Sequence, residues 1–303
     1  MIPWRPDFPA RRKPLGYLRL LRARHRFHDR VRPGFRLERV CGLPLPRPRL
    51  IDVPGDKARL AKLRDAHAGR RCFVIGNGPS LAGMDLSPLK DEVTIGSNGI
   101  YTRFAGWGFH TDYLLFEDME QTELRGPDIP GIRGPLKLAG LHNAYAFRPD
   151  AGTVFFNARL GDSFYWNRLA PVFSRDFSEI VYLNSTVTTI GLQLAYHLGC
   201  DPVVLVGVDH DYGRLPELFK PGKIRITEEN IDLVRGCHFD PGYYKLGDLI
   251  GVPNVKLQEQ GYREARHAFE RDGRRVLNAT AGGKLEVFER ADYRRLVGRA
   301  PGP

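Results

Sequence analysis

A glycine-rich turn provides the first candidate binding element. It spans residues 76–80, with the sequence GNGPS, and directly follows a short apolar run. A turn in this position exposes backbone N–H groups to an anion, and Gly76 and Gly78 allow the anion to approach closely. Asn77 and Ser80 add side-chain hydrogen bonds. The turn is neither a Walker loop nor a G-x-G-x-x-G motif. We predict that it binds an anionic ligand, with a purely structural tight turn as the alternative.

A second polar turn follows the next apolar run. It spans residues 96–99 and has the sequence GSNG. If the two preceding strands are neighbours in a sheet, Asn77 and Asn98 flank one pocket at the ends of those strands. The alternative interpretation of the second turn is a hairpin or the N-cap of a helix.

Two aspartates separated by one residue follow a third apolar run. Asp209 and Asp211 form a D-x-D pattern, which many glycosyltransferases use to hold a divalent metal on a nucleotide diphosphate. Carboxylates are suitable hard ligands for such an ion. No further residues have ligand spacing, so the alternative is that Asp209 is a hydrogen-bonding residue at a strand end.

A histidine lies in a polar stretch of the second half of the chain. His238 is close in sequence to Asp240, Tyr243 and Tyr244. An imidazole can accept the proton of an acceptor hydroxyl near neutral pH, and tyrosine hydroxyls can donate to a leaving phosphate. The alternative is an incidental loop histidine.

Three acidic residues form a further charged cluster. Glu117, Asp118 and Glu120 follow the apolar run that ends at Phe116. Runs of charge usually lie on a solvated surface. The simplest interpretation of this cluster is therefore a solvated face without a role in chemistry.

Short apolar runs alternate with helical patterns along the body of the chain, and these elements must position the polar residues. We expect strands at residues 72–75, 92–95, 112–116, 153–156, 180–183, 203–206 and 275–277. Apolar residues at helical spacing predict helices at residues 56–67, 185–198, 228–234 and 257–271. The alternation predicts an α/β fold with a mostly parallel sheet flanked by helices. Residues 207–255 otherwise show little periodicity and are expected to be loops.

The positive charge of the protein is concentrated in its first 50 residues. The net charge is +11, and residues 1–50 hold 14 basic and 3 acidic residues, a surplus that equals the whole net charge. A nucleic-acid-binding body is therefore not expected. Leu15, Leu18 and Leu21 follow Pro14 at helical spacing among arginines. This basic arm either lies on an anionic membrane surface or packs on the body as an arginine-rich helix.

Cysteine usage and hydropathy favour a cytoplasmic protein, possessing at most a peripheral contact with the inner face of the membrane through residues 1–50. The 4 cysteines show no C-x-x-C pairing. The N-terminus lacks the apolar segment of a secretory signal. No apolar run approaches the roughly 20 residues that cross a bilayer.

The sequence also contains an ordered series of motifs that resembles a known family. The motifs are CFVIGNGPSL, TIGSNGIY, STVTTIGLQLAYHLGC followed by VVLVGVDHDYG, CHFDPGYY and VLNATAGGKLEVFER. Together they resemble the MptE-like (6-hydroxymethylpterin diphosphokinase-like) family. That family is similar to the motility accessory factor glycosyltransferases and to bacterial sialyltransferases that use CMP-sialic acid. The resemblance covers residues 63–296 and leaves out the basic arm.

The resemblance implies roles for individual residues. In the similar sialyltransferases, asparagines after two neighbouring strands contact the CMP donor, and they correspond here to Asn77 and Asn98. A loop histidine is the general base, for which His238 is the nearest match. Tyrosines steady the departing phosphate, and the candidates here are Tyr212, Tyr243 and Tyr244.

One departure from the sialyltransferase pattern concerns the sugar. An arginine that these enzymes have just before the long helix is absent, because this chain has residues 184–186, NST, at that place. This departure argues against sialic acid itself. The sialyltransferases work without a metal, whereas pterin diphosphokinases need Mg²⁺. In a diphosphokinase, Asp209 and Asp211 would serve as ligands of that ion.

The combined expectation is a basic arm at residues 1–50 and a Rossmann-like catalytic domain at residues 51–303. We expect a glycosyltransferase without a cofactor that moves a sugar, such as a nonulosonic acid from a CMP donor, to a glycan or protein acceptor. The alternatives are Mg²⁺- and ATP-dependent pyrophosphoryl transfer to a pterin, or a non-catalytic nucleotide-binding scaffold. The residues expected to bind the donor are Gly76, Asn77, Gly78, Ser80, Asn98 and Asp209.

Overall fold

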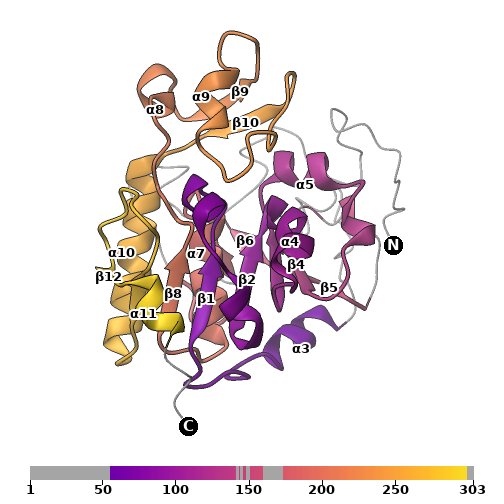
Figure 1. The fold of residues 1–303 in the computed structure, drawn as a ribbon. Coiled ribbons are helices and arrows are strands. Elements are labelled where there is room, and N and C mark those ends of the chain that lie inside the picture. The colour runs from indigo at the N-terminus through magenta and orange to yellow at the C-terminus, as the bar shows by residue number, and fades with distance from the viewer. Residues whose placement is uncertain (1–54, 141–142, 144–145, 148–150, 160–172, 299–303) are drawn as a thin grey trace, which may run out of the picture.

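The computed structural model describes residues 55–140, 143, 146–147, 151–159 and 173–298 (Figure 1). The basic arm predicted over residues 1–50, including its leucine-patterned helix, lies outside this part of the chain. Among the described residues, no helix has the length and apolar character needed to cross a membrane.

Eight parallel strands form the central sheet, in the order β12-β11-β8-β1-β2-β3-β4-β5. Every neighbouring pair runs parallel. Most strand residues are buried because helices cover both faces of the sheet. The predicted Rossmann-like α/β fold is therefore confirmed. The strands are β1 (Cys72–Ile75), β2 (Val93–Ser97), β3 (Tyr113–Phe116), β4 (Leu136–Gly140), β5 (Thr153–Phe156), β8 (Val203–Val206), β11 (Val276–Asn278) and β12 (Glu289–Arg290).

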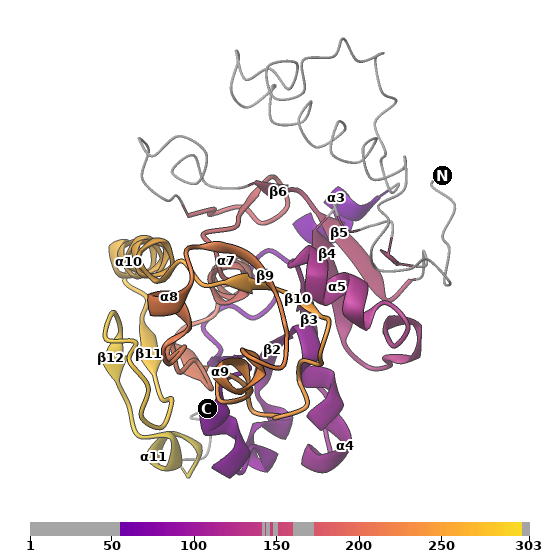
Figure 2. The ribbon, with the colours of Figure 1, turned by 90° about the horizontal axis from the view of Figure 1, so that it is seen from above.

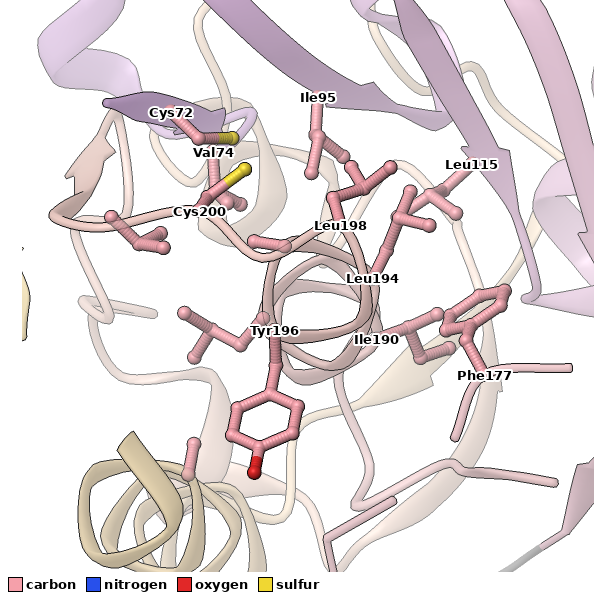
Figure 3. Close-up of a cluster of buried hydrophobic side chains, with 14 of the residues drawn as sticks. Cys72, Val74, Ile95, Leu115, Phe177, Ile190, Leu194, Tyr196, Leu198 and Cys200 are labelled. Carbon is pink, nitrogen blue, oxygen red and sulfur yellow. The ribbon is translucent and has the colours of Figure 1, made fainter. Parts of the chain in front are cut away.

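Alternate strand residues pack into two apolar layers, one on each face of the sheet. On one face the core includes α7 (Val187–His197) and α10 (Val255–Arg271). Figure 3 shows Leu194 of α7 and Leu198, which follows the helix, pointing toward Ile95 and Leu115 of the sheet. On the other face the core includes residues from short helices: η1 (Pro79–Gly83), η2 (Ser87–Asp91), η3 (Asn98–Arg103), α4 (Phe104–Trp107), η4 (Ile129–Gly131) and α11 (Tyr293–Val297).

The strand order reverses at β1. The chain adds β2 to β5 on one side of β1, and then adds β8, β11 and β12 on the other side. In open parallel sheets, ligands bind at the carboxyl ends of the strands beside such a reversal. The polar turns that follow β1, β2 and β8 all lie at these strand ends, so the topology brings them together.

A small cap stands over the carboxyl ends of the strands, at the top of Figure 1. The cap comprises residues 213–253 and contains α8 (Leu215–Leu218), β9 (Gly222–Arg225), α9 (Ile231–Arg235) and β10 (Leu249–Val252). Strands β9 and β10 pair antiparallel. The cap has an apolar cluster of its own, formed by Leu215, Ile226, Val234 and Ile250. Seen from above in Figure 2, it covers the middle of the sheet.

Several elements differ from the sequence-based expectation. The expectation of loops over residues 207–255 is wrong because the cap contains a strand pair, of which β9 is mostly exposed and therefore lacks an apolar run. The strand expected at residues 180–183 is β7 (Val181–Tyr182), which pairs with β6 (Ala158–Arg159) outside the main sheet. The helix expected at residues 56–67 is shorter, and is α3 (Asp56–Ala61).

One buried glutamine attaches β7 to α7. Gln193 Oε1 accepts the backbone N–H groups of Ser174 and Tyr182, at 3.1 and 3.0 Å. Its Nε2 donates to the carbonyls of Tyr182 and Thr189, at 2.7 and 3.0 Å. The side chain is fully buried. Gln193 therefore supplies hydrogen bonds to both backbone groups of Tyr182 in β7, which a neighbouring strand would otherwise provide. Strand β7 lies just before α7 in the chain.

We predict that Gln193→Leu destabilises the protein. The substitution leaves buried backbone donors and acceptors without partners, at a cost of about 1–3 kcal/mol or more. Chemical denaturation should show this loss, whereas Gln260→Leu, at an exposed position of α10, should change the free energy of unfolding by less than about 0.5 kcal/mol. Equal stability of the two variants would contradict the role of Gln193.

Candidate functional site

The glycine turn after β1 packs directly on the chain that leaves β8. The N–H of Gly76 donates to the carbonyl of Val206, and the N–H of Gly78 donates to the carbonyl of Gly207, both at 2.8 Å. A Cβ atom at Gly76 would overlap the Gly207 carbonyl, and one at Gly78 would overlap the carboxylate of Asp209. The structure thus uses these two N–H groups to join the strand ends, and not as free donors for an anion as the sequence suggested.

The two aspartates of the D-x-D pattern have different partners. Asp209 accepts the hydroxyl and the N–H of Ser80, at 2.8 and 3.1 Å, and burial raises its pKa. Asp211 pairs with Lys284 at 3.0 Å, which lowers the pKa of Asp211. In the described part of the chain, no group of three His, Cys, Asp or Glu residues is arranged to hold a metal ion. Asp209 therefore acts here as the hydrogen-bonding residue at a strand end.

A polar cavity of about 1000 Å³ lies between the strand ends and the cap. Its walls come from the ends of β2 and β3, the start of α7, the cap and the start of α10. Four of the predicted site residues line it: Asn98, Tyr212, His238 and Tyr244. The other predicted residues do not belong to its described lining: Gly76, Asn77, Gly78, Ser80, Asp209 and Tyr243.

Asn77 connects the glycine turn to two neighbouring segments. Strands β1 and β2 are neighbours, as the prediction of a shared pocket required. Asn77 Nδ2 donates to the carbonyl and the hydroxyl of Ser97, both at 3.1 Å. The carbonyl of Asn77 accepts the N–H of Phe239 at 3.0 Å. Asn77 therefore holds the segments that carry Asn98 and His238, and of these three residues Asn98 and His238 line the cavity whereas Asn77 does not.

His238 is packed between aromatic rings at the cavity wall. Its ring stacks on Tyr243, with centroids 4.3 Å apart and planes at 16°, and meets the ring of Tyr244 edge-on at 5.0 Å. Burial, followed by the positive charge of Arg125, lowers the pKa of His238 to about 4. Its Nδ1 is buried and has no hydrogen-bond partner among the described residues. His238 is therefore neutral at pH 7 and able to accept a proton.

Tyr243 forms the platform behind His238. Its hydroxyl accepts the N–H of Gly99 at 3.2 Å. The guanidinium of Arg125 lies 4.4 Å from the centre of its ring and donates to its carbonyl at 3.3 Å. Tyr243 is not among the described lining residues of the cavity and stacks behind His238. Arg125 was not anticipated from the sequence.

Tyr212 and Tyr244 both line the cavity. The hydroxyl of Tyr212 donates to Gln258 at 3.0 Å, and Gln258 in turn donates to the carbonyl of Ser185 at 3.0 Å. Burial raises the pKa of both tyrosines. Both hydroxyls are therefore protonated at neutral pH, and that of Tyr212 already donates its hydrogen to Gln258.

The prediction of a solvated face at Glu117, Asp118 and Glu120 is wrong. All three residues line the cavity, where β3 ends and α5 (Met119–Arg125) begins. Asp118 caps α5 by accepting the N–H of Gln121 at 2.7 Å. Burial, together with the charges of Glu117 and Glu120, raises the pKa of Asp118 to about 7. Glu120 pairs with Lys223 of the cap, and its side chain is only 10% exposed.

The sequence does contain a feature that points to these acidic residues as part of a site. That feature is their position directly after a strand, and not their charge. Glu117 is the first residue after a buried parallel strand, as are Gly76 after β1 and Asn98 after β2. The strand-end rule that singled out the other two turns therefore applied to this one as well.

The chain is distantly similar to a solved structure. No protein-family model matches the chain, and no curated protein matches it. Among solved structures, the MAf glycosyltransferase from Magnetospirillum magneticum AMB-1 is similar with a TM-score of 0.44 and 15% sequence identity. The match covers 78% of this chain and 38% of that one, so the chain spans well under half the length of that enzyme.

We predict that Asp118→Asn stabilises the protein increasingly as the pH rises. The pKa of Asp118 is about 7 in the folded protein, against an ordinary value of 3.8. The folded state therefore binds the proton more tightly, and the free energy of unfolding falls as the pH rises from about 3.8 to about 7. Asparagine caps a helix about as well but does not ionise. The melting temperature of the variant, relative to the wild type, should therefore rise between pH 5 and pH 8.

The matched control is Asp292→Asn, because Asp292 caps α11 in the same way, by accepting the N–H of Arg295 at 3.0 Å, but is exposed. This control should show no such pH-dependent gain. The same pH dependence in both variants, or its absence in Asp118→Asn, would contradict a raised pKa at Asp118.

Proposed function

We propose that the protein is a glycosyltransferase that moves a sugar from a nucleotide-activated donor to a cell-surface glycan precursor or a protein. The proposed donor is a nonulosonic acid linked to CMP. The observation that carries the proposal is the cavity at the carboxyl ends of β2 and β3, with the neutral ring of His238 on its wall. The motifs that resemble those of nucleotide-sugar transferases supply Asn98, Tyr212 and Tyr244 to the same cavity.

The size of the cavity supports a reaction between two substrates. Small-molecule sites usually measure about 300–1000 Å³. The volume here, about 1000 Å³, is at the upper end of that range. A nucleotide sugar together with the reacting part of an acceptor fits such a volume.

In the proposed reaction, an acceptor hydroxyl attacks the anomeric carbon of the donor sugar. The bond between that carbon and the phosphate oxygen breaks, and its electron pair leaves with the nucleotide. His238 takes the proton of the hydroxyl, through Nε2 because Nδ1 is enclosed. A pKa of about 4 keeps His238 unprotonated before the donor binds. The negative charge of a bound phosphate would raise this pKa and make the ring a stronger base.

The proposal also assigns groups to the nucleotide. Asn98 lines the cavity beside the glycine turn and suits a polar part of the nucleotide. Thr186, at the start of α7, and Lys256, at the start of α10, also line the cavity and suit a phosphate. In this proposal the hydroxyl of Tyr244 stabilises charge on the departing phosphate, and that of Tyr212 does so by exchanging Gln258 for the phosphate.

The partners of Asp209 and Asp211 favour sugar transfer over pyrophosphoryl transfer. Pyrophosphoryl transfer from ATP depends on Mg²⁺ held by oxygen ligands. The candidate ligands, Asp209 and Asp211, are bonded to Ser80 and Lys284 instead. Neither carboxylate belongs to the described lining of the cavity.

We predict that His238→Ala abolishes sugar transfer while it leaves nucleotide binding intact. The substitution removes the proposed base but none of the groups assigned to the nucleotide. Loss of a general base typically costs a factor of about 100 to 10,000 in rate. The measurements are turnover of CMP-nonulosonic acids, with and without EDTA, and the melting temperature with CMP, CTP, UDP, GDP or ATP.

The control is His267→Ala, which alters an exposed histidine of α10 and should keep full activity. Activity in His238→Ala would show that the base is misassigned. Stabilisation by ATP but not by CMP, with turnover that stops in EDTA, would favour the diphosphokinase alternative.

A further inference from the structure

The exposed apolar side chains of the described structure are concentrated in the cap. Among the described residues, the large hydrophobic side chains that are exposed belong to Leu218, Leu246 and Leu249, at 49%, 54% and 38%. Leu249 begins β10 and Leu246 lies three residues before it, whereas Leu218 ends α8. Scattered exposed leucines are ordinary on protein surfaces, but clustered ones mark interaction sites. The segment that enters β10 therefore differs from the rest of the described surface.

Leu249 lies on the outward face of the two-stranded ribbon formed by β9 and β10. It is directly opposite Arg225 in the antiparallel pair, so the two side chains share one face. The next residue, Ile250, points to the other face and is buried in the apolar cluster of the cap. Arg225 donates to the carbonyl of Gly247 at 2.7 Å, which holds the turn that carries Leu246 beside the same strand end. The end of the ribbon thus presents two leucines next to a basic side chain.

The ribbon is basic beyond Arg225. Residues 220–225 and 245–252, which include both strands, contain four basic residues and one acidic residue, Asp248. Lys223 pairs with Glu120, whereas in the described part of the chain the other three basic residues have no ion pair. Most other acidic residues of the cap lie between the two strands in sequence, on and around α9. We call the unpaired basic residues and the two leucines the ribbon patch: Lys220, Arg225, Lys245, Leu246 and Leu249.

The charge of the ribbon patch restricts what can cover it. A second copy of the chain, docked about a two-fold axis, would bring the same basic residues together, and like charges oppose such a contact. Residues 1–50 carry a basic surplus of their own, so the same repulsion opposes the arm. The complementary partner is therefore anionic.

The leucines restrict the partner further. Charged side chains on an exposed strand prevent unwanted strand pairing, but exposed leucines beside them do not serve that purpose. No residue of the ribbon patch lines the cavity, so its side chains lie on an open surface. Basic residues next to exposed leucines are the composition with which peripheral proteins bind anionic lipid, since the leucines enter the boundary between headgroups and acyl chains.

We propose that the ribbon patch docks on an anionic lipid bilayer. Leu246 and Leu249 enter the headgroup boundary, and the basic residues of the patch contact the headgroup phosphates. This surface is distinct from the basic arm, and the inference does not depend on the proposed function because docking needs no substrate. Lys223 and Gly251 of the same ribbon line the cavity, so docking brings the cap side of the cavity close to the bilayer.

Vesicle flotation measures the docking. The full chain is mixed with vesicles of phosphatidylcholine alone, or of phosphatidylcholine and phosphatidylglycerol in equal parts, at an ionic strength where the wild type binds only in part. We expect binding to the anionic vesicles, and a loss of this binding as salt screens the charges. No binding to either kind of vesicle, or equal binding to both, would overturn the proposal.

Two variants assign the binding to the ribbon patch. Leu246→Ser combined with Leu249→Ser removes the apolar side chains and should weaken partition into anionic vesicles about tenfold or more. Lys245→Gln removes one charge and should weaken it about fivefold. Residues 1–50 are present in every variant, so any contribution of the arm cancels in the ratio to the wild type. Unchanged partition in both variants would overturn the proposal.

The matched controls alter the same residue types outside the ribbon patch. Leu218→Ser changes the exposed leucine of α8, and Lys62→Gln changes an exposed lysine at the end of α3, far below the cap in Figure 1. Both should keep the partition of the wild type. A loss as large as that of the corresponding ribbon variant would show that the ribbon patch is not the docking surface.

Light scattering without vesicles tests a second copy as the occupant. The wild type and the double leucine variant should have the same molecular mass, because the leucines face lipid and not another chain. A wild-type dimer that dissociates when Leu246 and Leu249 are replaced would overturn the proposal in favour of self-association.

Discussion

The close approach between the turn after β1 and the chain after β8 is the contact on which the site depends. It requires glycine at positions 76 and 78, because a side chain at either would overlap Gly207 or Asp209. Once the turn is fixed, Asn77 bonds to Ser97 on one side and to Phe239 on the other. The segments that carry Asn98 and His238 are thereby held at one cavity, although they are far apart in sequence.

Burial favours the neutral form of two groups at the cavity, and it shifts their pKa values in opposite directions. The pKa of His238 falls to about 4, and the pKa of Asp118 rises to about 7, in each case mainly because the charged form is removed from water. The imidazole is then a free base at neutral pH, while the carboxyl group is partly protonated. Pairs of groups whose pKa values are moved apart by their environment are typical of sites that transfer protons.

The sequence allowed the sheet to be predicted because buried parallel strands leave a clear apolar signal. The runs at β1, β5 and β8 match their strands residue for residue. The cap strands were missed because β9 is exposed and short. Motif position singled out His238 and Asn98, which both line the cavity. The pairing of Ser80 with Asp209 spans 129 residues and has no local signal. The acidic residues after β3 were misinterpreted because their charge was weighed before their place at a strand end.

A crystal structure of the protein with CMP tests the central claim most directly, because it locates the nucleotide without knowledge of the sugar or the acceptor. The account predicts CMP inside the cavity, with its phosphate near Thr186 and Lys256 and within reach of Tyr212 or Tyr244. His238 should face the open space where the sugar would follow. CMP bound outside this cavity, or an empty cavity at saturating CMP, would contradict the account.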